Sequence, residues 1–81
     1  MKARLQMFAV ARQMAGREVL ELELPAAATV ADLRRELAIA VPALASFIDH
    51  LQFAVNADYA SDATPIPPNA DLACIPPVSG G

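Results

Sequence analysis

The chain has 81 residues, an apolar fraction of 56% and a formal net charge of −3. Domains typically run about 50–250 residues, so this length predicts one small domain with little interior to spare for a cofactor cavity. Six basic residues against nine acidic ones, with no basic run, argue against the cationic surface that nucleic-acid binding requires. The single cysteine excludes an intramolecular disulfide, and Cys74 with His50 provides too few ligands for a structural zinc ion.

No segment approaches the ~20 apolar residues that a membrane-spanning helix needs, and the first ten residues lack the apolar stretch of a signal peptide. The lone cysteine is typical of a reducing compartment. We therefore expect a soluble, cytoplasmic chain that binds no cofactor or metal of its own and has neither a membrane nor a nucleic acid as its partner.

Two strands are predicted at the start of the chain. Residues 3–9 alternate between apolar and polar side chains, and residues 18–24 alternate leucine with glutamate, which is the period of a half-buried strand. Phe8 departs from the first pattern, because it places a large aromatic side chain on the polar face. Between the two strands, residues 11–15 have a helical composition, and Gly16 is a suitable left-handed stop.

One main helix follows. Thr29 is placed to cap it, and Asp32 completes a capping box at the third helical position. Pro42 ends the helix. Helical spacing predicts a buried stripe and a charged face in water, the stripe formed by Val30, Leu33, Leu37 and Ala40/Val41 and the face by Asp32, Arg34, Arg35 and Glu36.

The second half of the chain predicts three more strands. Residues 42–50 are ambiguous and compatible with a short helical turn, residues 51–56 alternate again, and a turn leads to a brief strand near Tyr59. Residues 64–71 are rich in turn formers, and residues 72–76 form the last strand. This order predicts an α+β chain of the β-grasp, or ubiquitin-like, class: a mixed four- to five-stranded sheet with one main helix on one face. Residues 1–76 form the domain and residues 77–81 a flexible tail.

No catalytic constellation is present in the sequence. His50 beside Asp49 is expected at the surface, and Cys74 is expected to behave as a small buried hydrophobe. The most informative feature is the Gly80-Gly81 ending, in a chain with only three glycines. Without a Cβ, two glycines make the narrowest peptide end available, one that can enter a tunnel and carry its carboxylate to a buried site. That carboxylate reacts only after activation, which predicts ATP-dependent formation of an acyl-adenylate.

The ending Cys74-Ile-Pro-Pro-Val-Ser-Gly-Gly81 resembles the small subunit of molybdopterin synthase, a family that ends in Pro-Pro-Val, Ser or Thr, and Gly-Gly. The resemblance extends over essentially the whole chain, and Cys74 departs from it because a larger apolar residue is expected there. It also covers Phe8-Ala9 with Arg12 and Gly16, the helix start at Thr29-Val-Ala-Asp-Leu33, Val55-Asn56 and Asp71.

The resemblance implies a sulfur carrier that is not an enzyme by itself. A ubiquitin-activating-type adenylyltransferase would use ATP and Mg to adenylate Gly81, and a sulfur donor protein would convert it to a thiocarboxylate. The carrier would then dock on the large subunit of molybdopterin synthase, in a two-plus-two assembly, and donate sulfur to cyclic pyranopterin monophosphate. Gly80 would thread the active site, and Pro77, Val78 and Ser79 would contact the partner.

Strand alternation predicts a docking face as well. Phe8 is expected on the sheet face opposite the helix, Ile75 rather than Cys74 joins it, and Tyr59 is the third candidate. A contiguous apolar patch of this kind is typical of an interaction site. The alternative that these three side chains fill the edges of the core stays open.

Three other functions remain open from the sequence. They are the sulfur carrier of thiazole biosynthesis, a modifier conjugated to proteins through its Gly-Gly end, and a ubiquitin-like binding module whose Gly-Gly end is incidental. Deletion of Gly81 separates the last of these from the carriers, because a binding module would tolerate it.

Overall fold

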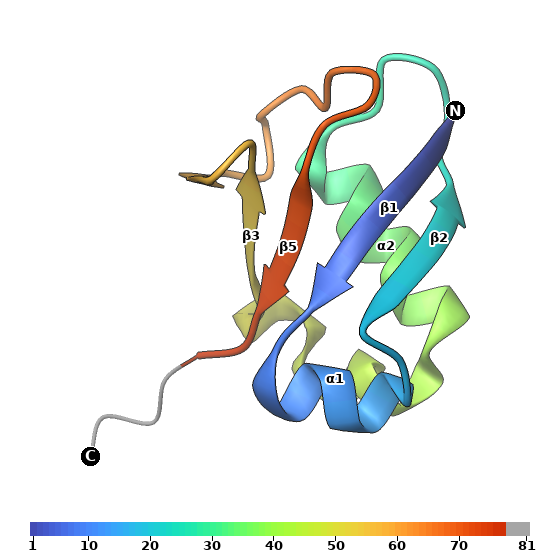
Figure 1. Ribbon diagram of the computed structural model, residues 1–81, viewed down its shortest axis with the longest axis vertical. Helices are drawn as coiled ribbons and strands as arrows, with labels where there is room; N and C mark the ends of the chain where they lie inside the picture. The colour runs from blue at the N-terminus through green and yellow to red at the C-terminus, as the bar shows by residue number, and fades with distance from the viewer. Residues whose placement is uncertain (78–81) are drawn as a thin grey trace.

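The computed structural model describes residues 1–77, and these form one five-stranded sheet with helices on one face and at one end (Figure 1). The strands follow the order β2-β1-β5-β3-β4. β1 and β5 are parallel, whereas the other neighbours are antiparallel. The strands are β1 (Lys2–Met7), β2 (Val19–Glu23), β3 (Gln52–Val55), β4 (Asp58–Ala60) and β5 (Leu72–Ile75).

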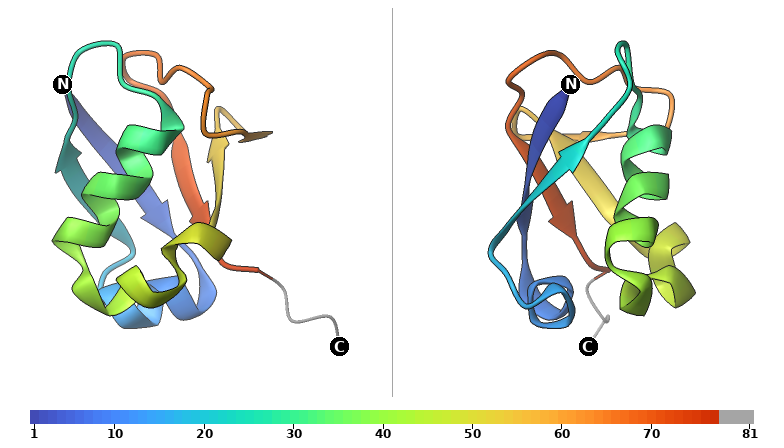
Figure 2. Two further views of the ribbon diagram at one scale, coloured as in Figure 1. Left: turned by 180° about the vertical axis from the view of Figure 1, so that it is seen from behind. Right: turned by 90° about the vertical axis from the view of Figure 1, so that its right-hand side faces the viewer.

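Three helical segments accompany the sheet. α2 (Val30–Ala40) crosses one face of it, as the right-hand view of Figure 2 shows, and is followed directly by the 3₁₀ helix η1 (Pro42–His50). The short α1 (Ala9–Ala15) lies at the end of the sheet where β1 and β5 finish (Figure 1). The arrangement confirms the predicted β-grasp class, with five strands and the first and last strands as central neighbours.

The helix boundaries follow the predicted signals. Thr29 and Asp32 form the capping box of α2, in which the Thr29 N–H donates to Asp32 Oδ2 at 2.9 Å. This hydrogen bond, followed by one from Arg35, holds the pKa of Asp32 below its ordinary value. Gly16 ends α1 at φ +73°, a conformation that glycine adopts without a steric cost.

The core lies between α2 and the sheet. Alternate residues of β1 point into it, including Leu5 and Met7, and the fully buried Phe53 and Cys74 face them from β3 and β5. Burial of apolar area at ~25 cal/mol per Å² is the main stabilising contribution in a domain of this size. None of the helices in the described part of the chain is long and apolar enough to cross a membrane.

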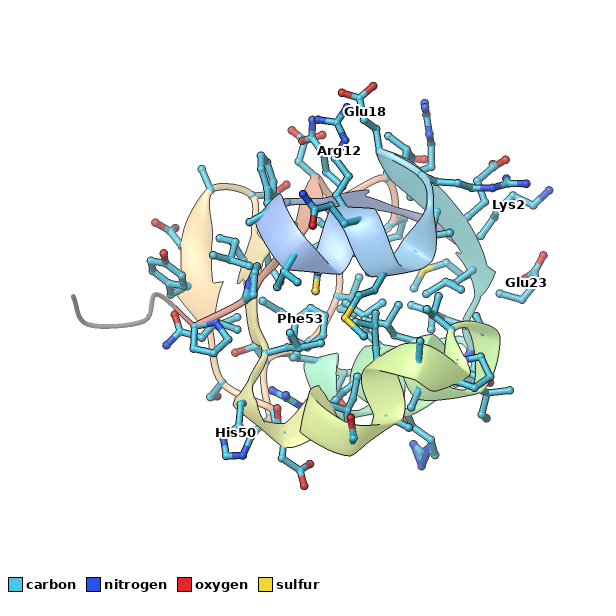
Figure 3. The ribbon with its side chains drawn as sticks, turned by 90° about the horizontal axis from the view of Figure 1, so that it is seen from below. Lys2, Arg12, Glu18, Glu23, His50 and Phe53 are labelled. Carbon is cyan, nitrogen blue, oxygen red and sulfur yellow. The ribbon has the colours of Figure 1, made fainter. Side chains whose placement is uncertain are left out.

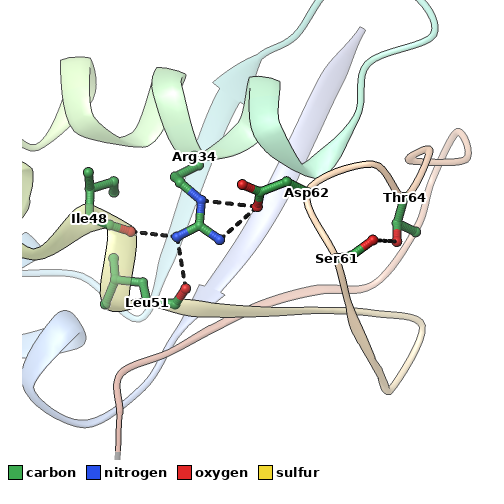
Figure 4. Close-up of polar contacts among 6 residues, drawn as sticks. All are labelled: Arg34, Ile48, Leu51, Ser61, Asp62 and Thr64. Carbon is green, nitrogen blue, oxygen red and sulfur yellow. Dashed lines mark hydrogen bonds and ion pairs between the residues drawn. The ribbon is translucent and has the colours of Figure 1, made fainter.

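One prediction about α2 is wrong. Arg34 was expected in water, but its side chain is only 16% exposed. Its guanidinium donates to the carbonyls of Ile48 and Leu51 at 2.5 and 2.9 Å, and to Asp62 Oδ1 at 2.8 Å (Figure 4). These acceptors come from η1, from Leu51 between η1 and β3, and from the loop after β4, which helical periodicity alone does not reveal. The end of the apolar stripe is Val41, because Ala40 is exposed.

Candidate functional site

The sheet face opposite α2, called here the outer face, carries the predicted docking residues. Met7 pairs with Cys74 across the parallel strands β1 and β5. The residues that follow them, Phe8 and Ile75, therefore lie side by side. The Phe8 N–H donates to the Cys74 carbonyl at 3.3 Å, which extends this pairing beyond the end of β1. Successive strand residues point to opposite faces, and the buried Cys74 therefore places Ile75 on the outer face.

Tyr59 reaches the same face from the sheet edge. It pairs with Ala54, which in turn pairs with Ala73. Phe8 and Tyr59 are 42% and 69% exposed, and Ile75 is half-buried. We call this surface the outer-face patch: Phe8, Tyr59, Ala73 and Ile75, with the buried Ala54 beneath them. The exposure of its two aromatic residues contradicts the alternative that they fill the edges of the core.

The chain leaves the sheet beside this patch. β5 is the central strand, and Pro76 and Pro77 follow it without an intervening turn. Pro76 is buried and Pro77 is exposed. A proline ring fixes φ near −65°, which stiffens the start of the tail. The predicted partner-contacting residues Val78 and Ser79, and the predicted reactive Gly80 and Gly81, lie outside the described residues.

The other half of the outer face is charged, a feature that the sequence analysis missed. Lys2 and Arg4 pair with Glu23 and Glu21 across β1 and β2, and these side chains are exposed. The alternation of residues in β1 and β2 could have revealed this charged surface, because the charged residues of each strand occupy every second position and so point to the same face. The outer face thus changes from charged to apolar toward the end where the tail begins.

The remaining candidates offer no reactive group among residues 1–77. Cys74 is fully buried, and burial raises the pKa of its thiol to about 11, so it stays protonated at neutral pH. His50 is exposed at the end of η1, on the helical side of the molecule (Figure 3). Within the described residues, no group of three or more His, Cys, Asp or Glu side chains could hold a metal ion. The site that this part of the chain presents is an exposed apolar surface beside the point where the chain leaves the sheet.

The fold and this surface define a ubiquitin-like β-grasp protein. A family model described as the ThiS family matches residues 5–81, and the chain belongs to this family. It is 33% identical over 75 residues to the molybdopterin synthase sulfur carrier subunit of Arabidopsis thaliana, a match that covers 93% of this chain and 78% of that protein.

Solved structures agree with this assignment. Small archaeal modifier protein 1 from Haloferax volcanii superposes with a TM-score of 0.88 at 29% identity over 100% of both chains. A putative molybdopterin converting factor subunit 1 from Pyrococcus furiosus gives 0.85 at 29% identity, over 96% of this chain and 99% of that one. Subunit 1 in a complex with subunit 2 of the molybdopterin-converting factor of Helicobacter pylori, at 20% identity over 100% of both chains and a TM-score of 0.67, shares the fold.

Proposed function

We propose that this chain is the sulfur carrier subunit of a molybdopterin synthase. The observation that carries the proposal is where the tail starts: Pro76 and Pro77 follow the central strand β5 beside the outer-face patch, and the sequence continues with Val-Ser-Gly-Gly81. Membership of the ThiS family and the Arabidopsis thaliana relative support a sulfur carrier. The patch is the surface through which a partner binds such a carrier while the C-terminal end of the carrier reacts in the active site of that partner.

The chemistry takes place at the Gly81 carboxylate. A carboxylate oxygen attacks the α-phosphorus of ATP, pyrophosphate leaves, and an acyl-adenylate forms. Hydrosulfide, or its equivalent from a sulfur donor protein, then attacks the carbonyl carbon, AMP leaves, and a thiocarboxylate remains. ATP and Mg are bound by an adenylyltransferase of the ubiquitin-activating type, so this chain needs neither a nucleotide site nor a metal site of its own.

Sulfur transfer then requires a second partner, the large subunit of molybdopterin synthase. The thiocarboxylate enters its active site and donates sulfur to cyclic pyranopterin monophosphate. Gly80 and Gly81 suit this step because they lack side chains that would obstruct a narrow passage. The Helicobacter pylori structure, which contains subunits 1 and 2 of the converting factor together, supports a partnership of this kind.

We assign docking on both partners to Phe8, Tyr59 and Ile75 of the outer-face patch, with Pro77, Val78 and Ser79 contacting the entrance of the active site. A small monomer rarely exposes a contiguous apolar surface unless it binds something. The expected assembly has two copies of each subunit, and the cytoplasm is its expected location.

The test is the intact mass of the chain after incubation with the adenylyltransferase, Mg-ATP and sulfide. The expected product has one carboxylate oxygen replaced by sulfur, located at Gly81 by fragmentation, because sulfoxidation of Met1, Met7 or Met14 adds nearly the same mass. A variant without Gly81 is the matched control and should stay unmodified.

An unmodified Gly81, with the adenylyltransferase shown to be active on another carrier, would overturn the proposal in favour of a binding module. An isopeptide bond between Gly81 and a lysine of another protein would favour a modifier instead. The similarity to small archaeal modifier protein 1 makes that outcome worth measuring in the same samples.

A further inference from the structure

The two outermost strands of the sheet differ in how much edge they present. β4 is only three residues long, and a short edge strand gives another chain little backbone to pair with. β2 is five residues long, contains no proline, and lies at the opposite side of the sheet (Figure 1). Its outer edge is therefore the longer of the two, and it keeps all of its backbone donors.

The hydrogen bonds to β1 show which backbone groups of β2 lie on this outer edge. The Glu18 carbonyl accepts the Met7 N–H at 2.7 Å, and the Leu24 N–H donates to the Met1 carbonyl at 2.7 Å, so residues 18 and 24 face β1. The pairing between them is continuous, and in an antiparallel pair only alternate residues exchange hydrogen bonds with the neighbouring strand. The residues whose N–H and C=O groups point away from β1, where residues 1–77 provide no further strand, are Val19, Glu21 and Glu23.

Charges alternate across the outer face as far as this edge. Arg4 of β1 lies between Glu21 of β2 and Asp71, the residue before β5, and all three are exposed. Arg4 and Asp71 line the same surface hollow. Nearer the start of β1, Lys2 pairs with Glu23 (Figure 3). Opposite charges on neighbouring strands stabilise a sheet, so a strand added beside β2 is favoured when it places basic residues opposite the two glutamates.

The other side chains of β2 are apolar. Leu20 is half-buried and packs against the core, and Leu22 is buried. Residues directly opposite each other in a sheet point to the same face, so residues of an added strand opposite these leucines would face the helical side. An apolar side chain opposite Leu20 would extend the core there. The strand that matches this edge therefore alternates basic with apolar residues.

We propose that the outer edge of β2 binds an extended segment of a partner protein in which basic and apolar residues alternate, and adds it to the sheet as an antiparallel strand. Main-chain hydrogen bonds to β2 hold the segment, and the alternation of its side chains selects it. β2 and β4 are opposite edges of the sheet, so this surface is separate from the outer-face patch, to which β4 contributes Tyr59. The inference goes beyond the proposed function, because a partner held at β2 leaves the patch available for docking.

The test is an NMR titration of the whole chain with a blocked peptide of alternating lysine and valine, five residues long to match β2. In the antiparallel pairing, the backbone nitrogens of the lysines donate to β2 and those of the valines point away. Methylation of the lysine backbone nitrogens should therefore abolish binding, and the peptide methylated at the valine nitrogens is the matched control that still binds. We expect the N–H signals of Val19, Glu21 and Glu23 to shift most and to exchange more slowly with solvent.

Two double variants test the contribution of charge. Glu21→Gln combined with Glu23→Gln removes both carboxylates of the edge and should weaken binding of the peptide roughly fivefold at low salt. Asp49→Asn combined with Asp58→Asn is the matched control, because it changes the net charge equally at two exposed carboxylates outside β2. Thermal unfolding verifies that both double variants are folded.

Several results would overturn the inference. They are the absence of shifts in β2 at millimolar peptide, shifts centred on the outer-face patch instead, equal binding of the two methylated peptides, and equal affinities of the two double variants. Shifts in β2 that depend on the concentration of the chain alone would identify a second copy of the chain as the occupant, and would overturn it too. Sulfur loading is measured separately, so failure of this test leaves the proposed function standing, and the reverse also holds.

Discussion

The guanidinium carbon of Arg34 lies 4.9 Å from the centroid of the Phe53 ring, so that a mostly buried cation of α2 covers the largest fully buried side chain of the core. The same guanidinium binds the Ile48 and Leu51 carbonyls and Asp62 (Figure 4). One side chain thereby connects α2 to η1, to β3 and to the loop that follows β4.

Replacement of Arg34 by alanine should therefore destabilise the domain. The change leaves two carbonyls without their donor and uncovers the Phe53 ring, and we expect the free energy of unfolding to fall by about 2–4 kcal/mol. Arg34→Lys should recover only part of this, because an ammonium cannot reproduce the fork of a guanidinium. Urea unfolding followed by circular dichroism measures both. Arg35→Ala, which removes an exposed pair with Asp32, serves as the control and should cost less than about 1 kcal/mol.

The turn between β3 and β4 should accept glycine with a gain in stability. Asn56 and Ala57 have φ values of +50° and +72°, the left-handed pair of a two-residue hairpin turn. Asparagine tolerates that region better than alanine does. Ala57→Gly should raise the free energy of unfolding by about 1 kcal/mol, measured by urea titration. Ala63→Gly, in the exposed loop after β4, should give no gain, and equal effects of the two changes would contradict the argument.

The buried thiol predicts how stability depends on alkaline pH. Burial raises the pKa of Cys74 from its ordinary value of 9.0 to about 11, so the unfolded chain releases this proton at a lower pH than the folded chain. The resulting stabilisation is complete below pH 9 and is lost as the pH rises toward 11, amounting to ~2–3 kcal/mol in total. Urea unfolding at several pH values measures it.

Cys74→Ala provides the control for this pH dependence. It should be less stable at neutral pH, because a core sulfur is lost, but its stability should fall less between pH 9 and pH 11. Identical pH profiles for the two chains would show that the thiol does not titrate differently in the folded and unfolded states.

The outer-face patch should matter for binding and little for folding. Phe8→Ala combined with Tyr59→Ala removes two exposed aromatic side chains, and loss of an aromatic hot spot from an interface costs about 2 kcal/mol or more. We expect the affinity for the large subunit to fall by roughly thirtyfold in calorimetry, with a thermal midpoint almost unchanged. Ile75 is left intact because it is half-buried.

Ile39→Ala is the matched control for the patch, since Ile39 is 68% exposed on α2. It should leave the affinity unchanged. A loss of affinity at Ile39 equal to that of the double variant would move the interface to the helical side of the molecule.

The sequence predicts the sheet because its signals are local. Alternation in residues 18–24, the Thr29–Asp32 capping box and the stop at Gly16 each depend on neighbours within a few positions, and the structure confirms all three. The outer position of Phe8 and Ile75 also follows from alternation, because a strand has only two faces.

Arg34 and η1 were harder to predict because their environment is not local. The acceptors of Arg34 lie 14–28 residues away in the sequence, and a helical pattern treats any arginine between two leucines as a residue that faces water. Residues 42–50 have an apolar composition without a clear period, and they form a 3₁₀ helix that packs against α2 and against α1, an element distant from it in the sequence.

The central position of β5 has a consequence for synthesis of the protein. A chain that stops before Leu72 leaves β1 and β3 with facing, unpaired edges and leaves the core without Cys74. Such a fragment cannot close the sheet, and exposed edges of this kind favour aggregation. The ribosome must therefore release nearly the whole chain before the domain can form. A folded domain is thus itself a sign that translation has passed β5, and any enzyme that recognises the folded surface receives only chains synthesised at least that far.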